Sequence, residues 1–459
     1  MASLGDSEPV ARGTVTRRRL IRRALGAAAV VGGGGLIAAC QQATSPASPT
    51  AALQPGASSP GTPKPGGTLS IGVYAYIPQG IPFDQVVKNY TDKYPGVQVN
   101  VQPMGVDLTR DAAAFVQRLA AEAQQKRSSY DIIVGPTTWI EVALLAKVQA
   151  IDPIDQYLPK GLLDDLYPGA RAGVTYADGK IYSMPWWADV VGLMYRKSML
   201  RAAIGSETPP STWDQVIDYS AKLKARYPDK SPFGADWPQS HRLYLPILST
   251  MTKNMYTSEG IWNTEDPAVS ETLELIKKLV PLMPASSGED LGSSKAFQAG
   301  NVAMASYWPT QVLRAIQAGQ PADDIAMSAN PKGKHSGTLF WHADVVIPKF
   351  SANKEEAGRF LNDALLSDFT VQKSLDNWKI APFKKVNERN ESKLPAWAKP
   401  LVAELGSGTP IPMNPYWLGF EQPVFKEEVE KMILKGQSTM DTQKNLTARI
   451  REKFKEFTR

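Results

Sequence analysis

The pattern of hydrophobic and polar positions predicts alternating strands and helices at the start of the globular chain. Strand-like runs occupy residues 68–76, 97–101 and 130–134. Helical spacing of apolar side chains occupies residues 83–94 and 111–126. This order indicates a parallel sheet covered by helices, which binds ligands at the carboxyl ends of its strands. The loops expected at that edge are residues 75–81, 104–109 and 135–139.

The stretch 178–197 is predicted to carry the chain from one folded body into another. A turn at Asp178-Gly179 precedes two β-like runs, which Pro185 interrupts beside Trp186, Trp187 and Asp189. Two indoles beside a carboxylate suit a site that stacks on an apolar face and hydrogen-bonds a polar rim. For each ring there are two alternatives, a position in the hydrophobic core and a position that lines a cleft. Alternation along a strand predicts that the two rings point to opposite faces.

Helical patterns dominate the chain from Thr212, the expected N-cap of a helix, to Val280. Residues 301–307 then predict a strand, which follows a helix ending at Gly300 and which Pro309 stops. Trp308 is therefore expected at the carboxyl end of a strand, where it would stack on a ligand; the alternative is an ordinary core ring. Further patterns predict a strand at residues 339–348 and a closing helix at 442–457.

Charge and cysteine content separate the N-terminal segment from the rest of the chain. The net charge is +6, but residues 1–39 hold six arginines and two acids, which leaves 45 basic and 43 acidic residues beyond them. A nucleic-acid partner is therefore not expected. Cys40 is the single cysteine, so the sequence predicts no disulfide framework, no thiolate metal site and no thiol nucleophile.

The N-terminal segment has the features of an export signal. Residues 16–22 carry a twin-arginine pattern, and residues 24–39 form an apolar run that ends in Ile37-Ala38-Ala39-Cys40. This ending resembles a bacterial lipobox, in which cleavage leaves Cys40 as the lipidated N-terminus. The alternative is a transmembrane anchor, but about 24 Å of helix is short for a core of ~30 Å. We expect a signal peptide at 1–39 and, from its Ser, Pro, Thr and Ala content, a disordered tether at 40–66.

From about Gly66 to the C-terminus, the order of motifs resembles the extracellular solute-binding proteins of bacterial ABC importers. The carbohydrate-binding group that includes maltose-binding protein is the most similar. The motifs that carry this resemblance are Tyr94-Pro95-Gly96 after the first helix, residues 179–197, the helix start at residues 210–213, and residues 297–309.

The resemblance implies a type II periplasmic-binding-protein-like α/β fold, in which two lobes, each a sheet flanked by helices, are joined by a hinge. The expected lobes are residues 67–187 with 305–350, and residues 188–304 with 351–459. It also implies a lipoprotein that binds a mono- to oligosaccharide or a related polyol and passes it to the transmembrane subunits of a permease. The protein is expected to be exported, anchored on the outer face of the cytoplasmic membrane, and monomeric.

Matching positions and the richness in tryptophan give the expected ligand-binding residues, which are Trp139, Trp186, Trp187, Asp189, Trp308, Trp341, His342 and Trp417. The sequence also departs from the pattern of these binders. Thr310 replaces a tyrosine, Leu339 and Phe340 replace glycines, and no acid lies near residues 79–81. These differences remove hydrogen-bonding groups from a disaccharide pocket and argue against maltose or trehalose as the ligand.

The sequence does not favour an enzyme. The three histidines have no metal-ligand spacing, and no serine nucleophile elbow or phosphate-binding glycine loop is present. No cofactor and no metal are expected. A secreted glycoside hydrolase with paired carboxylates is the remaining enzyme alternative, because such acids need to be close only in space. A surface lipoprotein without a transport role is the third hypothesis.

Overall fold

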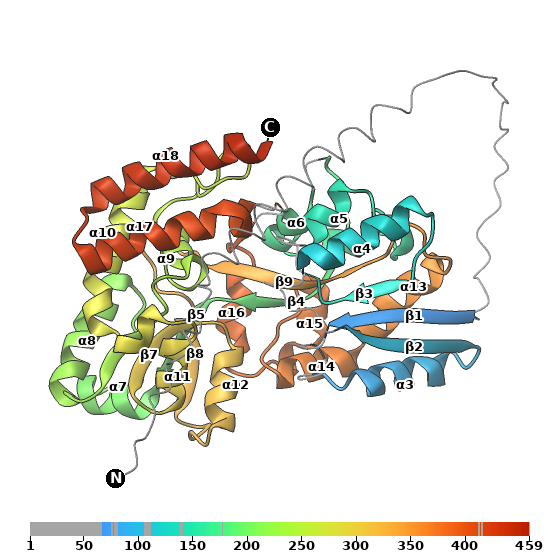
Figure 1. The fold of residues 1–459 in the computed structure, drawn as a ribbon. Helices are drawn as coiled ribbons and strands as arrows, with labels where there is room; N and C mark the ends of the chain where they lie inside the picture. The colour runs from blue at the N-terminus through green and yellow to red at the C-terminus, as the bar shows by residue number, and fades with distance from the viewer. Residues whose placement is uncertain are drawn as a thin grey trace, which may run out of the picture. The chain divides into compact units, whose positions relative to one another are not determined.

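The computed structural model describes residues 67–74, 77, 81–104, 112–136, 141–176, 178–411, 414 and 416–458 (Figure 1). Cys40, the expected signal peptide, the tether and Trp139 lie outside these ranges. The described residues form two sheets with helices around them. No helix among them is both long enough and apolar enough to cross a membrane.

The first sheet contains the three strands predicted at the start of the globular chain. Its strands are β1 (Gly67–Tyr74), β2 (Val97–Met104), β3 (Ile132–Val134), β4 (Met184–Val190), β9 (Leu339–Val346) and β10 (Thr409–Pro410). β1 lies between β2 and β3 and is parallel to both, which confirms the predicted parallel arrangement. β9 joins this group antiparallel to β3, and β4 pairs antiparallel with β9.

Helices cover the first sheet. They are α3 (Phe83–Lys93), α4 (Ala112–Gln124), α5 (Ala143–Lys147), α6 (Pro168–Val174), α13 (Lys354–Phe360), α14 (Asp368–Asp376), α15 (Lys384–Arg389) and α16 (Ala398–Glu404). Figure 1 shows α4 and α5 on one side of the sheet and α3 and α14 on the other. α3 buries Phe83, Val86 and Tyr90, whose spacing of three and four residues places them on one face of the helix. The helix predicted from this spacing is therefore confirmed.

The second sheet has the strand order β6-β7-β5-β8. Its strands are β6 (Ser231–Gly234), β7 (Val302–Tyr307), β5 (Gly192–Arg196) and β8 (Ile325–Ser328). Its helices are α7 (Lys197–Ile204), α8 (Trp213–Arg226), α9 (Tyr244–Met251), α10 (Pro267–Leu279), α11 (Gly292–Gln298) and α12 (Thr310–Gln317). Thr212 caps α8 as predicted, since its side chain accepts a hydrogen bond of 3.2 Å from the backbone N–H of Gln215.

One of the crossings between the two sheets takes only a single residue, Val191. β4 of the first sheet ends at Val190 and β5 of the second begins at Gly192, which confirms the predicted passage between two bodies. The carbonyl of Val191 accepts a hydrogen bond of 2.5 Å from the hydroxyl of Thr338, just before β9. A Cβ atom on Gly192 would lie 2.5 Å from the backbone oxygen of Ser328. Glycine is needed here because no larger residue lets β5 and β8 approach this closely.

Two C-terminal helices, α17 (Gln422–Lys435) and α18 (Thr439–Thr458), pack against each other and beside α10. Burial alone would raise the pKa of Glu428, but hydrogen bonds, those from Lys431, Gln437 and Arg449 among them, lower it to about 2. Because Arg449 lies on α18, the ionised Glu428 ties the two helices together.

The sheets divide the chain differently from the expected lobe boundaries. β7 and β8 lie within or next to the segment 305–350 assigned to the first lobe, but they belong to the second sheet. Residues of α13 to α16, within the segment 351–459 assigned to the second lobe, bury their side chains in a hydrophobic cluster that holds residues of β1 and β3 and also of β7 and β8. The strand patterns did not reveal this exchange because they show where strands lie but not which neighbours they pair with.

Candidate ligand-binding site

Two partly buried tryptophans from different sheets meet where the chain crosses between them. Trp308 follows the last residue of β7 and precedes α12, so its predicted place at a strand end is confirmed. Trp341 lies in β9. The ring centroids are 6.1 Å apart with the planes at 68°, an edge-to-face contact. Both rings are partly exposed, so an apolar surface remains for a ligand to cover.

An ion pair lies beside this ring pair. Asp189 of β4 is opposite Trp341 of β9 in the sheet register, so the two side chains share a face. Lys379 donates a hydrogen bond to Asp189, and its ammonium lies 3.4 Å from the hydroxyl of Thr310. Burial raises the pKa of the Asp189 carboxyl, while the charges of Lys379 and Arg314 oppose that rise.

The Lys379 ammonium is also close to two aromatic rings. Its nitrogen lies 5.3 Å from the centroid of Trp187 and 6.0 Å from that of Trp341. These distances fall within the range of cation–π attraction. The site therefore combines aromatic rings with a carboxylate from β4 and a cation from the segment after α14.

Trp186 and Trp187 do not point to opposite faces, so the prediction from strand alternation is wrong. The pairing of β4 with β9 shifts between Pro185 and Trp187, which leaves Trp186 as an extra residue. Such a β-bulge interrupts the regular alternation of side chains. The two indole rings instead contact each other, with centroids 4.4 Å apart, and both are almost fully buried.

His241 links Trp308 to Trp417. The imidazole stacks on Trp308 with centroids 5.3 Å apart and planes 7° apart, and it meets Trp417 edge to face at 5.1 Å. Trp417 is buried and donates a hydrogen bond of 3.2 Å to the hydroxyl of Ser240. Burial, with the neighbouring charge of Arg242, lowers the pKa of His241 well below its usual value. The ring that supports Trp308 is therefore neutral at pH 7.

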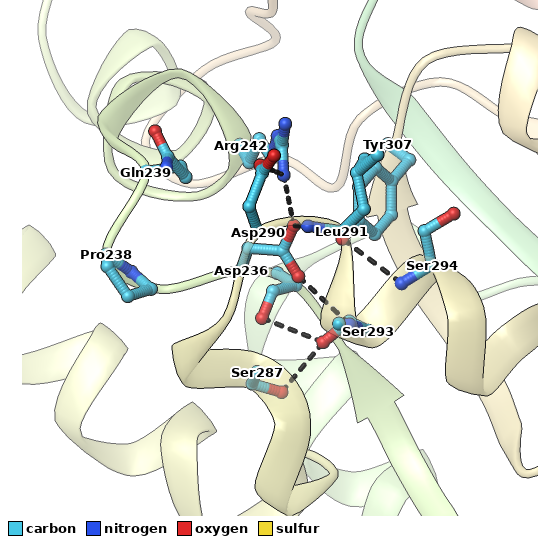
Figure 2. A network of polar contacts seen from close by, with 12 residues as sticks. Asp236, Pro238, Gln239, Arg242, Ser287, Asp290, Leu291, Ser293, Ser294 and Tyr307 are labelled. Atoms are coloured by element: carbon cyan, nitrogen blue, oxygen red, sulfur yellow. Dashed lines mark hydrogen bonds and ion pairs between the residues drawn. The ribbon is translucent and has the colours of Figure 1, made fainter. Parts of the chain in front are cut away.

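A polar network fixes the loop that carries His241 (Figure 2). The buried carboxylate of Asp236 accepts hydrogen bonds from the backbone N–H groups of Leu291 and Ser293, at 2.9 and 3.0 Å, and pairs with Arg242. Arg242 also forms an ion pair of 2.8 Å with Asp290. Since Arg242 follows His241 directly, the network holds the imidazole against Trp308.

His342 lies on the face of β9 opposite to Trp341. Its ring is buried and contacts Phe340, with centroids 5.5 Å apart. A Cβ atom on Gly173 of α6 would lie 2.7 Å from His342, which shows how tightly α6 covers the ring. Burial lowers the pKa of His342 to about 3 and raises that of the nearby Asp344 well above its usual value. The imidazole of His342 is therefore uncharged at neutral pH.

The structure brings together most of the expected site residues. Trp187, Asp189, Trp308, Trp341 and Trp417 form one connected group, with Trp186 buried behind Trp187. His342 is not part of it, and Trp139 lies outside the described residues.

The residues that the sequence interpretation missed are His241, Lys379 and Arg314. No local pattern marks them, because His241 and Lys379 contact the site from distant segments and Arg314 acts on Asp189 only through its charge. Thr310 was noticed only as a departure from the related binders.

A cavity of about 530 Å³ lies among residues 153–181, and none of the expected ligand-binding residues lines it. In the part of the chain that the structure describes, no cluster of three or more His, Cys, Asp or Glu side chains could hold a metal ion.

Solved structures show which fold the chain has. The sugar-binding protein MalE of Xanthomonas citri superposes with a TM-score of 0.74 at 18% identity, covering 85% of this chain and 98% of that one. The cyclic α-maltosyl-1,6-maltose binding protein of Arthrobacter globiformis superposes with a TM-score of 0.70 at 18% identity, covering 84% and 99%. The fold is thus the two-lobed, type II α/β fold of periplasmic binding proteins, as the sequence resemblance implied.

Sequence comparison gives the family. Residues 74–368 match the bacterial extracellular solute-binding proteins, and the chain belongs to this family. A relative described as "Probable ABC transporter-binding protein" from Deinococcus radiodurans is 24% identical over 271 residues, which is 55% of this chain and 62% of the relative. The family membership confirms the resemblance seen in the sequence.

Proposed function

We propose that this protein is the substrate-binding protein of an ABC importer and that it binds a carbohydrate at the site formed by Trp308, Trp341 and Lys379. The observation that carries the proposal is the contact between Trp308 and Trp341, one from each sheet, with both rings partly exposed. Rings of this kind stack on the apolar C–H face of a sugar, and neighbouring polar groups bind its hydroxyls. The sugar-binding proteins with the same fold support this assignment.

The expected cellular role belongs to the same proposal. The protein is exported, anchored through Cys40 and held off the membrane by residues 40–66, and it delivers its ligand as a monomer to the membrane subunits of a permease. In this proposal one lobe is built around the first sheet and the other around the second. Relative movement of the lobes changes the distance between Trp308 and Trp341, so that ligand bound between the rings favours the closed state.

A binding screen with a turnover control tests the proposal. The body from Gly66 to Arg459 is heated with mono- and oligosaccharides and polyols, and each mixture is also checked for new reducing ends. We expect a raised melting temperature with at least one carbohydrate and no hydrolysis, because a ligand that binds only the folded state stabilises it. Hydrolysis would support the glycoside hydrolase instead. No shift with any carbohydrate would contradict the proposal.

A further inference from the structure

The ammonium of Lys379 is placed to meet the ligand before the carboxylate of Asp189 does. The Lys379 side chain is 13% exposed and that of Asp189 is 1% exposed. Two of the three ammonium N–H groups are directed to Asp189 and Thr310. Within the described ranges, no acceptor meets the third. Asp189 thus orients Lys379, and a ligand approaching the rings encounters a hydrogen-bond donor with a positive charge.

A second positive charge, that of Arg314, lies near Lys379 at this edge of the site. Thr310 and Arg314 are four residues apart on α12, so their side chains lie on the same face of the helix. Arg314 is exposed, and the part of the chain that the structure describes offers it no hydrogen-bond or ion-pair partner. The charge of Lys379 balances that of Asp189 in their ion pair. The guanidinium of Arg314 is therefore a positive charge without a counter-ion at this edge of the site.

The segment that follows His241, the residue stacked on Trp308, has a different charge. There Arg242 forms ion pairs with Asp236 and Asp290, so its guanidinium, unlike that of Arg314, already has anionic partners (Figure 2). The group of Arg242, Asp236 and Asp290 therefore has a net negative charge, whereas the group of Lys379, Arg314 and Asp189 has a net positive one. A ligand with an anionic group would be oriented by this difference, with its negative end next to Arg314.

We infer that the ligand is an acidic carbohydrate, such as a uronic-acid oligosaccharide, whose carboxylate binds Lys379 and Arg314 while its sugar ring stacks on Trp308 and Trp341. This inference rests on the proposed function and adds the chemical class of its ligand. A guanidinium and an ammonium form charge-assisted hydrogen bonds with a carboxylate, which are stronger than the hydrogen bonds of neutral hydroxyls.

Matched pairs of sugars test the inference. Galactose and galacturonate trimers, and mannose and mannuronate trimers, are titrated into wild-type protein and into Arg314→Gln by calorimetry. At least one uronate should bind more tightly than its neutral partner, and its affinity should fall with added salt because the charges are screened. Arg314→Gln should weaken uronate binding about tenfold or more, and neutral-sugar binding less than about twofold.

A control and a second variant keep the result interpretable. Arg226→Gln removes another exposed arginine, at the end of α8 and outside the site, and should leave uronate affinity unchanged. The double variant Lys379→Met with Asp189→Asn removes both buried charges together and should also lose the preference for uronates. The inference would be overturned if neutral trimers bind as tightly as uronates, or if Arg314→Gln does not change uronate binding. Either result would still agree with the proposed function. Binding of neither class would contradict both.

Discussion

Asp189 and Lys379 form a nearly dry ion pair although 190 residues separate them along the chain. Asp189 is the last charged residue before the crossing from β4 to β5, and Lys379 follows α14. Through Thr310, Lys379 also contacts the start of α12, next to the second sheet. This ion pair therefore joins the segments that meet at the candidate site.

Removing one partner of this pair should destabilise the fold. Lys379→Met leaves the Asp189 carboxylate buried without its counter-ion, and we expect a loss of about 3 kcal/mol in the free energy of unfolding at pH 7. The loss should be smaller at pH 5, because Asp189 then takes up a proton more readily. Urea denaturation at both pH values measures this.

A double-mutant cycle separates the ion pair from packing. Adding Asp189→Asn to Lys379→Met should recover much of the lost stability, since the uncompensated charge is gone. Asp368→Asn, which removes one partner of an exposed ion pair with Arg389, is the matched control and should change stability by less than about 1 kcal/mol. Equal losses for the single and double variants would mean that Lys379 acts only through packing.

Glu421 should make the protein less stable as the pH rises. Its side chain is buried and accepts a hydrogen bond of 2.7 Å from the backbone N–H of Trp262. Burial raises its pKa from 4.5 to about 8. Between these values the folded state keeps a proton that the unfolded state has lost, so stability falls with pH at up to about 1.4 kcal/mol per unit.

The variant Glu421→Gln isolates this effect. It should remove the Glu421 contribution to the pH dependence between about 4.5 and 8 and should be more stable than wild type above pH 8. Glu456→Gln, an exposed change on α18, should keep the wild-type dependence. Urea midpoints across this pH range measure the slopes, and a slope in Glu421→Gln as steep as in wild type would contradict the assignment.

The proposed membrane anchor depends on Cys40. Cys40→Ser should block lipidation, so that the protein is found unprocessed or released into the soluble fraction after cell lysis. Fractionation with an antibody to the folded body measures this. Membrane retention of a fully processed Cys40→Ser protein would show that another segment anchors it.

Local sequence patterns predicted most of the secondary structure, because the spacing of apolar residues follows directly from helix and strand geometry. They also placed Trp308 at the end of a strand, since Pro309 cannot continue it. Patterns failed where contacts depend on distant segments. The bulge at Trp186 is visible only once β4 pairs with β9, and nothing near Lys379 or His241 indicates the partners that they find.

The order of the sequence motifs predicted the family, but it did not predict which charged groups meet at the site. Asp189 was expected to accept hydrogen bonds from the ligand, and this role remains a prediction. The structure places Lys379 between that carboxylate and the more exposed part of the site. The proposed chemical class of the ligand therefore depends on a residue that the sequence did not single out.

Tryptophan fluorescence during a ligand titration tests the central claim most directly. Wild-type protein and Trp308→Phe are titrated with the carbohydrate that gives the largest thermal shift. Trp378→Phe is the control, because that ring is also partly buried but stacks on Trp397, with centroids 4.4 Å apart. We predict that Trp308→Phe weakens binding and reduces the fluorescence change, with only a modest shift in melting temperature, while Trp378→Phe keeps wild-type affinity. Wild-type affinity and a full fluorescence response in Trp308→Phe would contradict the assignment of this site.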